Sequence, residues 1–274
     1  CEDETQAQEM AVQLKELNEE RKNMTQKGVE EALSLVEEQY ENDPVLVVYL
    51  PDCHESLAGI IAGRVREAWN RPSFVLTRSA EEADSQDGEE TVPMAKGSGR
   101  SIEAYHMYQG LCGVQDLLVK FGGHPMAAGF SLREADIEEF RRRLNEQADL
   151  KPEDFVRKIW IDVPMPLEYI SEGLIEELKQ LEPFGQGNEK PQFAQKNLLI
   201  RSSRVLGRNR NAVKLSLVTE QGYSMEGMLF TEGDRFMEEL GSQKHIDVIY
   251  YPDVNEYNGN RTLQIVVREY KLHP

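Results

Sequence analysis

The sequence predicts a long helix, then an α/β domain, then an all-β barrel, within 274 residues. An apolar run at 45–50 is followed by an amphipathic stretch at 56–69 and a second apolar run at 73–77. A strand, a helix and a strand joined by short connections are typical of a parallel crossover. After Phe193 five strand-like segments recur with turns between them, which favours a small closed barrel.

The first segment, residues 1–42, has apolar residues at a helical period with charged residues on its other faces, and we expect a linking helix. The α/β domain is expected over residues 43–149. An acidic stretch at 79–91 has no apolar period and is interpreted as a surface excursion. The remaining elements of this domain are expected to be a strand at 92–96, a helix from 106 to 121, a strand at 126–132 and a helix at 134–147.

A connecting segment is expected over residues 150–192. Its alternating run Val156–Val163 predicts a strand, and the amphipathic run Leu167–Leu181 predicts a helix that Pro183 ends. Residues 193–274 would then form the barrel, for which an OB-fold is the usual five-stranded case. Its strands are expected at 197–206, 212–218, 224–230, 245–250 and 261–268.

Composition limits the classes of function. A net charge of −18 argues against binding nucleic acid by bulk electrostatics, but the strip from Arg201 to Lys214 carries five cations and no acid. The three cysteines are scattered without a Cys-x-x-Cys pair, so a zinc site is not expected and a reducing cytoplasm is. No run of eighteen apolar residues exists, so no membrane span is predicted.

Two clusters of small residues indicate a phosphate site. The predicted helix ending at Phe121 runs into Gly122-Gly123-His124, where backbone amides could converge on an anion beside a histidine. Upstream, residues 95–101 alternate glycines with hydroxyls between Lys96 and Arg100, and these are phosphate-binding groups. Each cluster taken alone also fits an ordinary turn, with a surface histidine in one and incidental charges in the other.

These clusters resemble a known family. Together with Asp52-Cys53-His54-Glu55-Ser56-Leu57-Ala58-Gly59 they are similar to the DHHA1 domain of DHH phosphoesterases. The segment Leu181-Glu182-Pro183-Phe184-Gly185-Gln186-Gly187-Asn188 resembles the approach to the OB-fold in the RecJ family of single-stranded-DNA exonucleases. No Asp-His-His occurs here, so the resemblance is to a C-terminal portion without the catalytic DHH domain.

The resemblance implies an activity and partners. The parent protein is expected to be a 5′→3′ exonuclease of DNA repair and recombination that uses Mn²⁺ or Mg²⁺ held by the DHH domain. This chain has no Asp/His/Glu set with metal-site spacing and is expected to be inactive alone. Its expected partners are single-stranded DNA and the DHH domain, with no membrane partner, in a monomeric cytoplasmic protein.

The resemblance also implies roles for residues. The Ser-x-Arg of this family helps to bind a 5′ phosphate, which assigns that task to Ser98, Gly99, Arg100 and Ser101. His124 would act in catalysis beside the Gly122 and Gly123 amides. Arg21 falls where the linking helix nears the active cleft, although a solvated arginine paired with a neighbouring glutamate is as good an interpretation.

In the barrel, bases would stack on aromatic residues inside a basic groove. Phe230 and one of Tyr250 and Tyr251 are expected to lie in the core, which leaves Tyr223 and Tyr257 among the possible platforms. The cations expected to contact the strand are Arg201, Arg204, Arg208, Arg210 and Lys214.

Two other functions stay open. One is a DHH phosphoesterase that acts on short oligonucleotides or cyclic dinucleotides, but such relatives usually end after the DHHA1 domain. The other is a catalytically silent binding scaffold. The sequence that precedes Cys1 in the parent protein would separate an enzyme from a scaffold.

Overall fold

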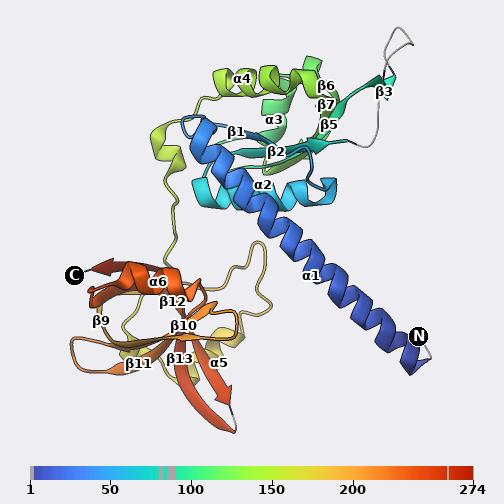
Figure 1. Cartoon of the computed structure of the whole chain (residues 1–274). Helices are drawn as coiled ribbons and strands as arrows, with labels where there is room; N and C mark the ends of the chain where they lie inside the picture. The colour runs from blue at the N-terminus through green and yellow to red at the C-terminus, as the bar shows by residue number, and fades with distance from the viewer. Residues whose placement is uncertain (1–2, 80–82, 85–90, 258, 274) are drawn as a thin grey trace. The chain divides into compact units, whose positions relative to one another are not determined.

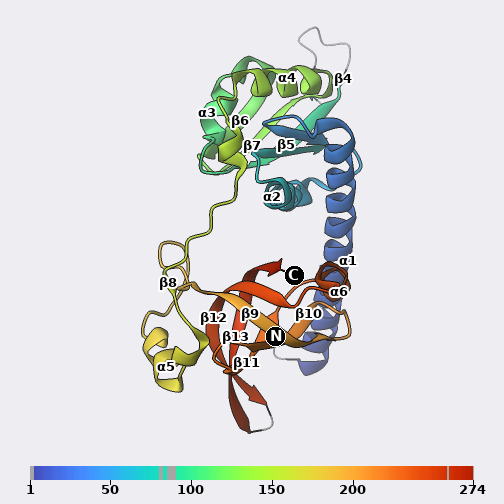
Figure 2. The same ribbon diagram turned by 90° about the vertical axis from the view of Figure 1, so that its left-hand side faces the viewer.

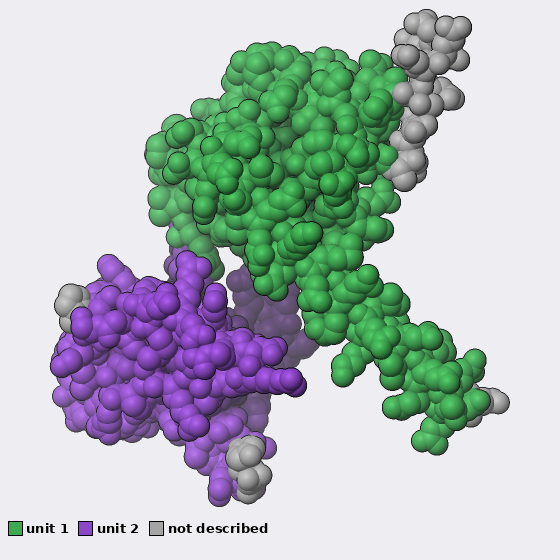
Figure 3. Space-filling view, in the orientation of Figure 1, with its two compact units in different colours: residues 1–157 green, residues 158–274 purple. Residues whose placement is uncertain are grey.

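The computed structural model describes residues 3–79, 83–84, 91–257 and 259–273. The chain divides into two compact units, residues 1–157 and 158–274 (Figure 3). Of the acidic stretch 79–91, residues 80–82 and 85–90 lie outside the described residues. The rest of it contributes to a short antiparallel pair, β3 (Ala83–Asp84) with β4 (Thr91–Val92). No helix in the described part is long and apolar enough to cross a membrane.

The first unit begins with the long helix α1 (Glu4–Leu35), which continues into a π-type turn at Val36–Tyr40. Asp3 caps its first turn by accepting a hydrogen bond from the Thr5 amide at 2.9 Å. Most of α1 is exposed, and only Gly28 and Ala32 of its own residues are buried. The predicted linking helix is confirmed.

A five-stranded mixed sheet forms the centre of this unit (Figure 1). Its strand order is β1-β2-β5-β7-β6. The strands are β1 (Leu46–Tyr49), β2 (Ser73–Arg78), β5 (Met94–Arg100), β6 (Leu118–His124) and β7 (Ala127–Arg133). β1 and β2 are parallel and α2 (Ala58–Trp69) joins them, which confirms the predicted crossover. The other neighbours pair antiparallel.

Helices cover both faces of the sheet. Successive side chains of a strand point to opposite sides, so each strand contributes apolar residues to both faces. Leu46, Val48 and Val75 pack with α1 and α2 in one apolar cluster. The alternate residues of the same strands pack with α3 (Met107–Cys112) and α4 (Ile137–Gln147) in a second cluster. Phe130 stacks on Phe140 there, with ring centroids 4.9 Å apart.

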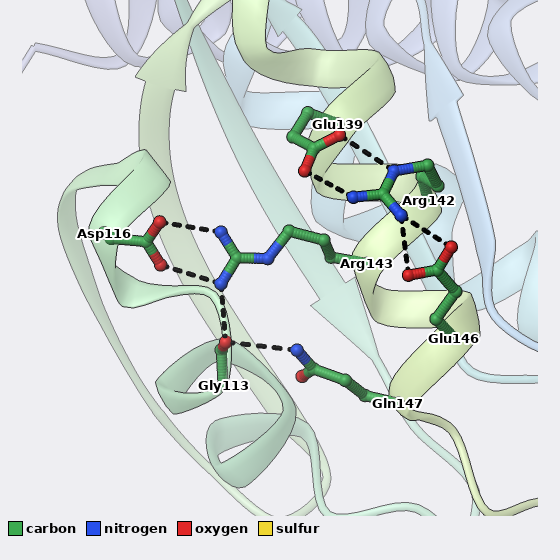
Figure 4. Close-up of polar contacts among 7 residues, drawn as sticks. All are labelled: Gly113, Asp116, Glu139, Arg142, Arg143, Glu146 and Gln147. Atoms are coloured by element: carbon green, nitrogen blue, oxygen red, sulfur yellow. Dashed lines mark hydrogen bonds and ion pairs between the residues drawn. The ribbon is translucent and has the colours of Figure 1, made fainter.

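Polar contacts fasten α4 to the segment after α3 (Figure 4). The Arg143 guanidinium makes a bidentate contact with Asp116 at 2.7 and 2.8 Å, and it also donates to the Gly113 carbonyl at 3.0 Å. Gln147 donates to the same carbonyl at 3.2 Å. The segment that leads into β6 is therefore fixed against α4.

The predicted helix from His106 to Phe121 is wrong beyond Cys112. A 3₁₀ turn at Gln115–Leu117 follows α3, and residues 118–124 then form β6. Gly122 and Gly123 are strand residues opposite Gly129 and Ala128, not a loop after a helix. Antiparallel pairing with β7 fixes them, and local sequence does not reveal that long-range contact.

The second unit is a closed five-stranded barrel (Figure 2). Its strands are β9 (Phe193–Leu206), β10 (Ala212–Val218), β11 (Ser224–Leu229), β12 (His245–Tyr257) and β13 (Asn260–His273). β9 pairs with both β10 and β12, which closes the barrel, and β11 runs parallel to β13. This order confirms the predicted OB-fold.

Two predictions for this unit need correction, and one helix was missed. The strand expected at Val156–Val163 is reduced to β8 (Val163–Pro164), and the helix expected at Leu167–Leu181 is a 3₁₀ turn at Leu167–Tyr169 followed by α5 (Glu172–Lys179). The helix α6 (Gly233–Leu240), between β11 and β12, was not predicted. Leu167, Ile175 and Leu178 are buried with the barrel residues, so this segment is part of the barrel core.

Candidate nucleic-acid interface

The first candidate site is the face that β5, β7 and β6 turn towards α2. Residues paired across antiparallel strands share a face, and the register sets Ser98, Gly129 and Gly122 in one row. The next row along the strands contains Arg100, Ala127 and His124. The row on the other side contains Lys96, Ser131 and Lys120. Residues from both predicted clusters therefore share one face.

A cavity of about 490 Å³ opens on this face. Gly122 and Gly129 line its floor, which therefore carries no side chain at these two positions. The space above Gly122 is open, since a Cβ added there would have no atom within 4 Å. Cations and hydroxyls border the bare backbone. The lining residues are Glu55, Ser56, Ala58, Lys96, Gly97, Ser98, Lys120, Phe121, Gly122, Gly129, Phe130 and Ser131.

Arg100 lies beside this cavity and is hydrogen-bonded to Ser98, which lines it. Its Nη1 donates to the Gly99 carbonyl at 2.8 Å and to Ser98 Oγ at 3.2 Å. Both acceptors are neutral, so the guanidinium keeps its full charge, and its other N–H groups donate to no residue in the described ranges. A half-buried cation with free donors beside a hydroxyl can bind a phosphate.

His124 lies in the same row as Arg100, two strands away, so their backbones are separated by about 10 Å. The side chain is exposed, and its Nδ1 accepts a hydrogen bond from the Met126 amide at 3.3 Å. That contact fixes the ring in the β6–β7 hairpin and leaves Nε2 as the nitrogen available to a ligand. His124 and Arg100 could contact one strand at different phosphates, but they do not contact each other.

Other predicted residues have structural roles. A Cβ on Gly99 would lie 2.8 Å from Met107 Sδ, and a Cβ on Gly123 would lie 2.4 Å from the Ala127 carbonyl oxygen. Both glycines are thus required for packing. Ser101 is buried and its hydroxyl donates to the Tyr105 carbonyl at 2.6 Å. Arg21 is exposed on α1 and donates to Asn18 at 3.1 Å.

Sequence reasoning missed Lys120 and Ser131, which border the cavity with the expected Lys96. Lys120 and Ser131 face each other across β6 and β7, and Lys96 forms an ion pair with Glu55 at 3.1 Å. Alternation within residues 118–124 would have placed Lys120 with Gly122, but only after the segment had been recognised as a strand.

The second candidate site is the outer face of the barrel at β9, β10 and β11. Val213 and Leu215 are buried, so Lys214 points outward, and Arg204 lies opposite it on β9. Phe230 directly follows β11 and is 67% exposed, so the expectation that it belongs to the core is wrong. It continues the outward alternation of β11.

The cations of this face differ in their partners. Arg210 makes a bidentate ion pair with Asp234 of α6, and its hydrogen bonds hold the pKa of Asp234 below the ordinary value. Lys214 pairs with Glu226 at 2.8 Å. Within the described residues, Arg201, Arg204 and Arg208 form no ion pair. These three are exposed and available to a polyanion.

The paired tyrosines belong to the barrel interior. Tyr250 is fully buried and its hydroxyl donates to the Met165 carbonyl at 2.6 Å. Tyr251 is also buried, and the Lys190 ammonium lies 3.7 Å from its ring centroid. Burial raises the pKa of both tyrosines. One of the two was expected in the core, but both are buried, so neither is left as a stacking platform, and Tyr223 is half-buried.

Comparison with known families agrees with both units. Residues 42–149 match the DHHA1 domain and residues 161–269 match the RecJ OB domain. The chain belongs to the RecJ family. The single-stranded-DNA-specific exonuclease RecJ of Bacillus subtilis is 32% identical over 270 residues, which are 98% of this chain and 33% of that protein. RecJ of Escherichia coli is 30% identical over 277 residues, covering 97% of this chain and 46% of that protein.

A solved RecJ structure shares the fold. The crystal structure of Thermus thermophilus RecJ in complex with Mg²⁺ matches with a TM-score of 0.74 and 25% identity, over 100% of this chain and 39% of that one. The chain thus spans between a third and a half of the RecJ relatives described here.

The described residues do not fit a divalent metal. They contain no group of three or more histidine, cysteine or carboxylate side chains that could hold an ion. The T. thermophilus protein was crystallised with Mg²⁺ and also with Mn²⁺.

Proposed function

We propose that this chain is the strand-holding part of a RecJ-type 5′→3′ single-stranded-DNA exonuclease. In the longer protein, a DHH domain with Mn²⁺ or Mg²⁺ would activate water for phosphodiester hydrolysis. The residues of this chain would bind the 5′ phosphate, orient the strand and keep its path single-stranded.

The observation that carries the proposal is the pairing of Arg100 with Ser98 beside a glycine-floored cavity. A terminal phosphate carries more negative charge than an internal one, and a guanidinium with free donors next to a hydroxyl suits it. Lys120 borders the same cavity and adds positive potential, whereas the charge of Lys96 there is offset by its ion pair with Glu55. Its bare floor would let the sugar–phosphate backbone approach the sheet closely.

The barrel would hold the rest of the strand. OB-folds bind oligonucleotides on the face of their second and third strands and on the adjoining loops. In this chain those are β10, β11 and the loop 207–211, where exposed Phe230 could stack on a base. Arg204 and Arg208 would contact the phosphates. Local cations would thus bind DNA despite the net charge of −18.

The test is fluorescence anisotropy of this chain with a single-stranded oligonucleotide that has either a 5′ phosphate or a 5′ hydroxyl, over a salt series. We expect tighter binding of the phosphorylated strand and a residual, salt-sensitive affinity for the other. Equal affinity for both ends would contradict the assignment of end recognition to this chain and leave only the barrel as a strand-binding surface.

A further inference from the structure

Helix α2 passes over the Ser98–Arg100 pair at Gly59. A Cβ at this position would lie 2.8 Å from Arg100 Nη2, 2.9 Å from Ser98 Oγ and 3.4 Å from Arg100 Cζ. The first two separations are shorter than carbon can approach nitrogen or oxygen without a shift. The observed positions of the guanidinium and the hydroxyl therefore exist only because residue 59 has no side chain.

The kind of atom that Gly59 meets is informative. The glycines of the packed core face rigid groups, as at Gly97, where a Cβ would lie 2.2 Å from the Phe130 ring. Gly59 instead faces the free ends of two polar side chains, which can swing aside at little cost to folding. A methyl group at 59 would therefore disturb the position of Arg100 and Ser98 more than the stability of the domain.

Gly59 also adjoins the cavity. Its neighbour Ala58 and the preceding Glu55 and Ser56 line the cavity wall, so the first turn of α2 borders the space in which a phosphate would lie. Arg100 Nη1 is held by the Gly99 carbonyl and Ser98, whereas Nη2, the atom nearest Gly59, donates to no residue in the described ranges. Nη2 is thus a donor left for a ligand on the side of the guanidinium that faces α2.

We propose that Gly59 is a positioning residue of the 5′-phosphate site: it leaves the space in which Arg100 Nη2 and Ser98 Oγ are held side by side towards the phosphate. This inference rests on the proposed function. It adds that discrimination between a phosphorylated and an unphosphorylated 5′ end depends on the absence of a side chain at residue 59 of α2. An alanine at 59 would turn the guanidinium fork away and break its alignment with the phosphate oxygens.

The same helix supplies a matched control. Gly63 lies one turn further along α2, and a Cβ there would have no atom within 4 Å. Alanine is a better helix former than glycine, so neither G59A nor G63A should weaken the helix itself. They differ in what the new methyl group meets.

The experiment compares wild-type chain, G59A, G63A, R100A and the double variant G59A/R100A. For each, anisotropy gives the affinity for 5′-phosphorylated and 5′-hydroxyl oligonucleotides, and thermal unfolding gives the melting temperature. We expect R100A to remove the preference for the phosphorylated end and G59A to reduce it at least five-fold. G63A should keep it, and G59A should change nothing further in the R100A background. Binding of the 5′-hydroxyl strand should stay within two-fold throughout.

The outcomes separate the two proposals. If R100A keeps the wild-type preference, the proposed phosphate site is wrong. If R100A loses it but G59A keeps it, the site stands and the role of Gly59 is overturned. A lower melting temperature in G59A that is relieved in G59A/R100A would still report the contact with Arg100. A loss of stability that persists in the double variant would overturn the inference.

Discussion

The two candidate faces use their cations in different ways. On the sheet of the first unit, the Arg100 guanidinium donates, among the residues that the structure describes, only to the neutral oxygens of Ser98 and Gly99 and keeps its charge. On the barrel, Arg210 and Lys214 are paired with Asp234 and Glu226, so part of the basic strip is neutralised within the protein. The number of cations in a sequence is therefore a poor guide to an anion site, because the local partner of each cation decides what remains for a ligand.

The faces also differ in shape and in what they can recognise. The sheet face is a cavity with a glycine floor, suited to one end group of defined size. The barrel face presents an exposed ring and free arginines on an open surface, which suits any stretch of a strand. We therefore expect the first face to discriminate between ends and the second to supply affinity that does not depend on the end.

The largest expected effect comes from removing the charge on the sheet face. R100A should lower the affinity for a 5′-phosphorylated strand by about 1.5–3 kcal/mol, roughly 10- to 150-fold, because hydrogen bonds to a charged group are lost. Titration by anisotropy against both ends would measure it. R64A, which removes an exposed arginine paired with Glu67 on α2, is the control and should bind like wild type. An equal loss for both ends in R100A would remove the contrast between the faces.

Next in size is the aromatic residue of the barrel. F230A should weaken binding of both ends equally, by about 1–3 kcal/mol, since one stacked base is lost. Y169A removes another exposed ring of the same unit, outside the strands of the candidate face, and serves as the control. If F230A reduced only the preference for the phosphorylated end, the division of tasks between the two faces would be wrong.

A smaller effect should separate the free from the paired arginines. R204A should reduce the slope of log affinity against log salt by about 0.7, as expected for the loss of one phosphate contact with a single strand. R210A should leave the slope nearly unchanged, because Asp234 already neutralises that side chain. Salt titrations of both variants measure the difference. Equal slopes for R204A and R210A would mean that ion pairing does not decide which cations bind DNA.

The smallest effect concerns acid stability. Arg210 lowers the pKa of Asp234 in the folded chain below 3.8, so this contact stabilises the fold above that pH and is lost as the pH falls through the lowered value. The wild-type melting temperature should therefore fall more than that of D234N when the pH drops below about 4. R210A, which lacks the other partner, should behave like D234N. A parallel decline in all three would show that the pair does not contribute.

Much of the architecture could be predicted from local pattern, but the site could not. The crossover at residues 45–77 and the strand at 212–218 followed from apolar runs and turn residues. Residues 118–124 were misassigned because Gly-Gly after an apolar run resembles the end of a helix. Only pairing with β7 makes this segment a strand, and that pairing is not visible in a single sequence.

The same limit applies to individual side chains. Ser98 and Arg100 lie on one side of β5, and alternation along a strand is a local property that the sequence carries. The neighbours that decide their chemistry, Gly122, Gly129 and Gly59, come from three other elements. Phe230 was assigned to the core from its residue type, whereas the barrel register turns it outward.

At Gly122, on the floor of the cavity, selection for a stable fold and selection for use of the site can be told apart. Because a methyl group there would meet no atom within 4 Å, an alanine at 122 could arise without a steric cost to folding. Quality control in the cell would not detect such a change, since it responds to unfolded chain. Under the proposed function, binding of a 5′ phosphate in the cavity would favour glycine at this position, so its history in a lineage would record use of the site and not maintenance of the fold.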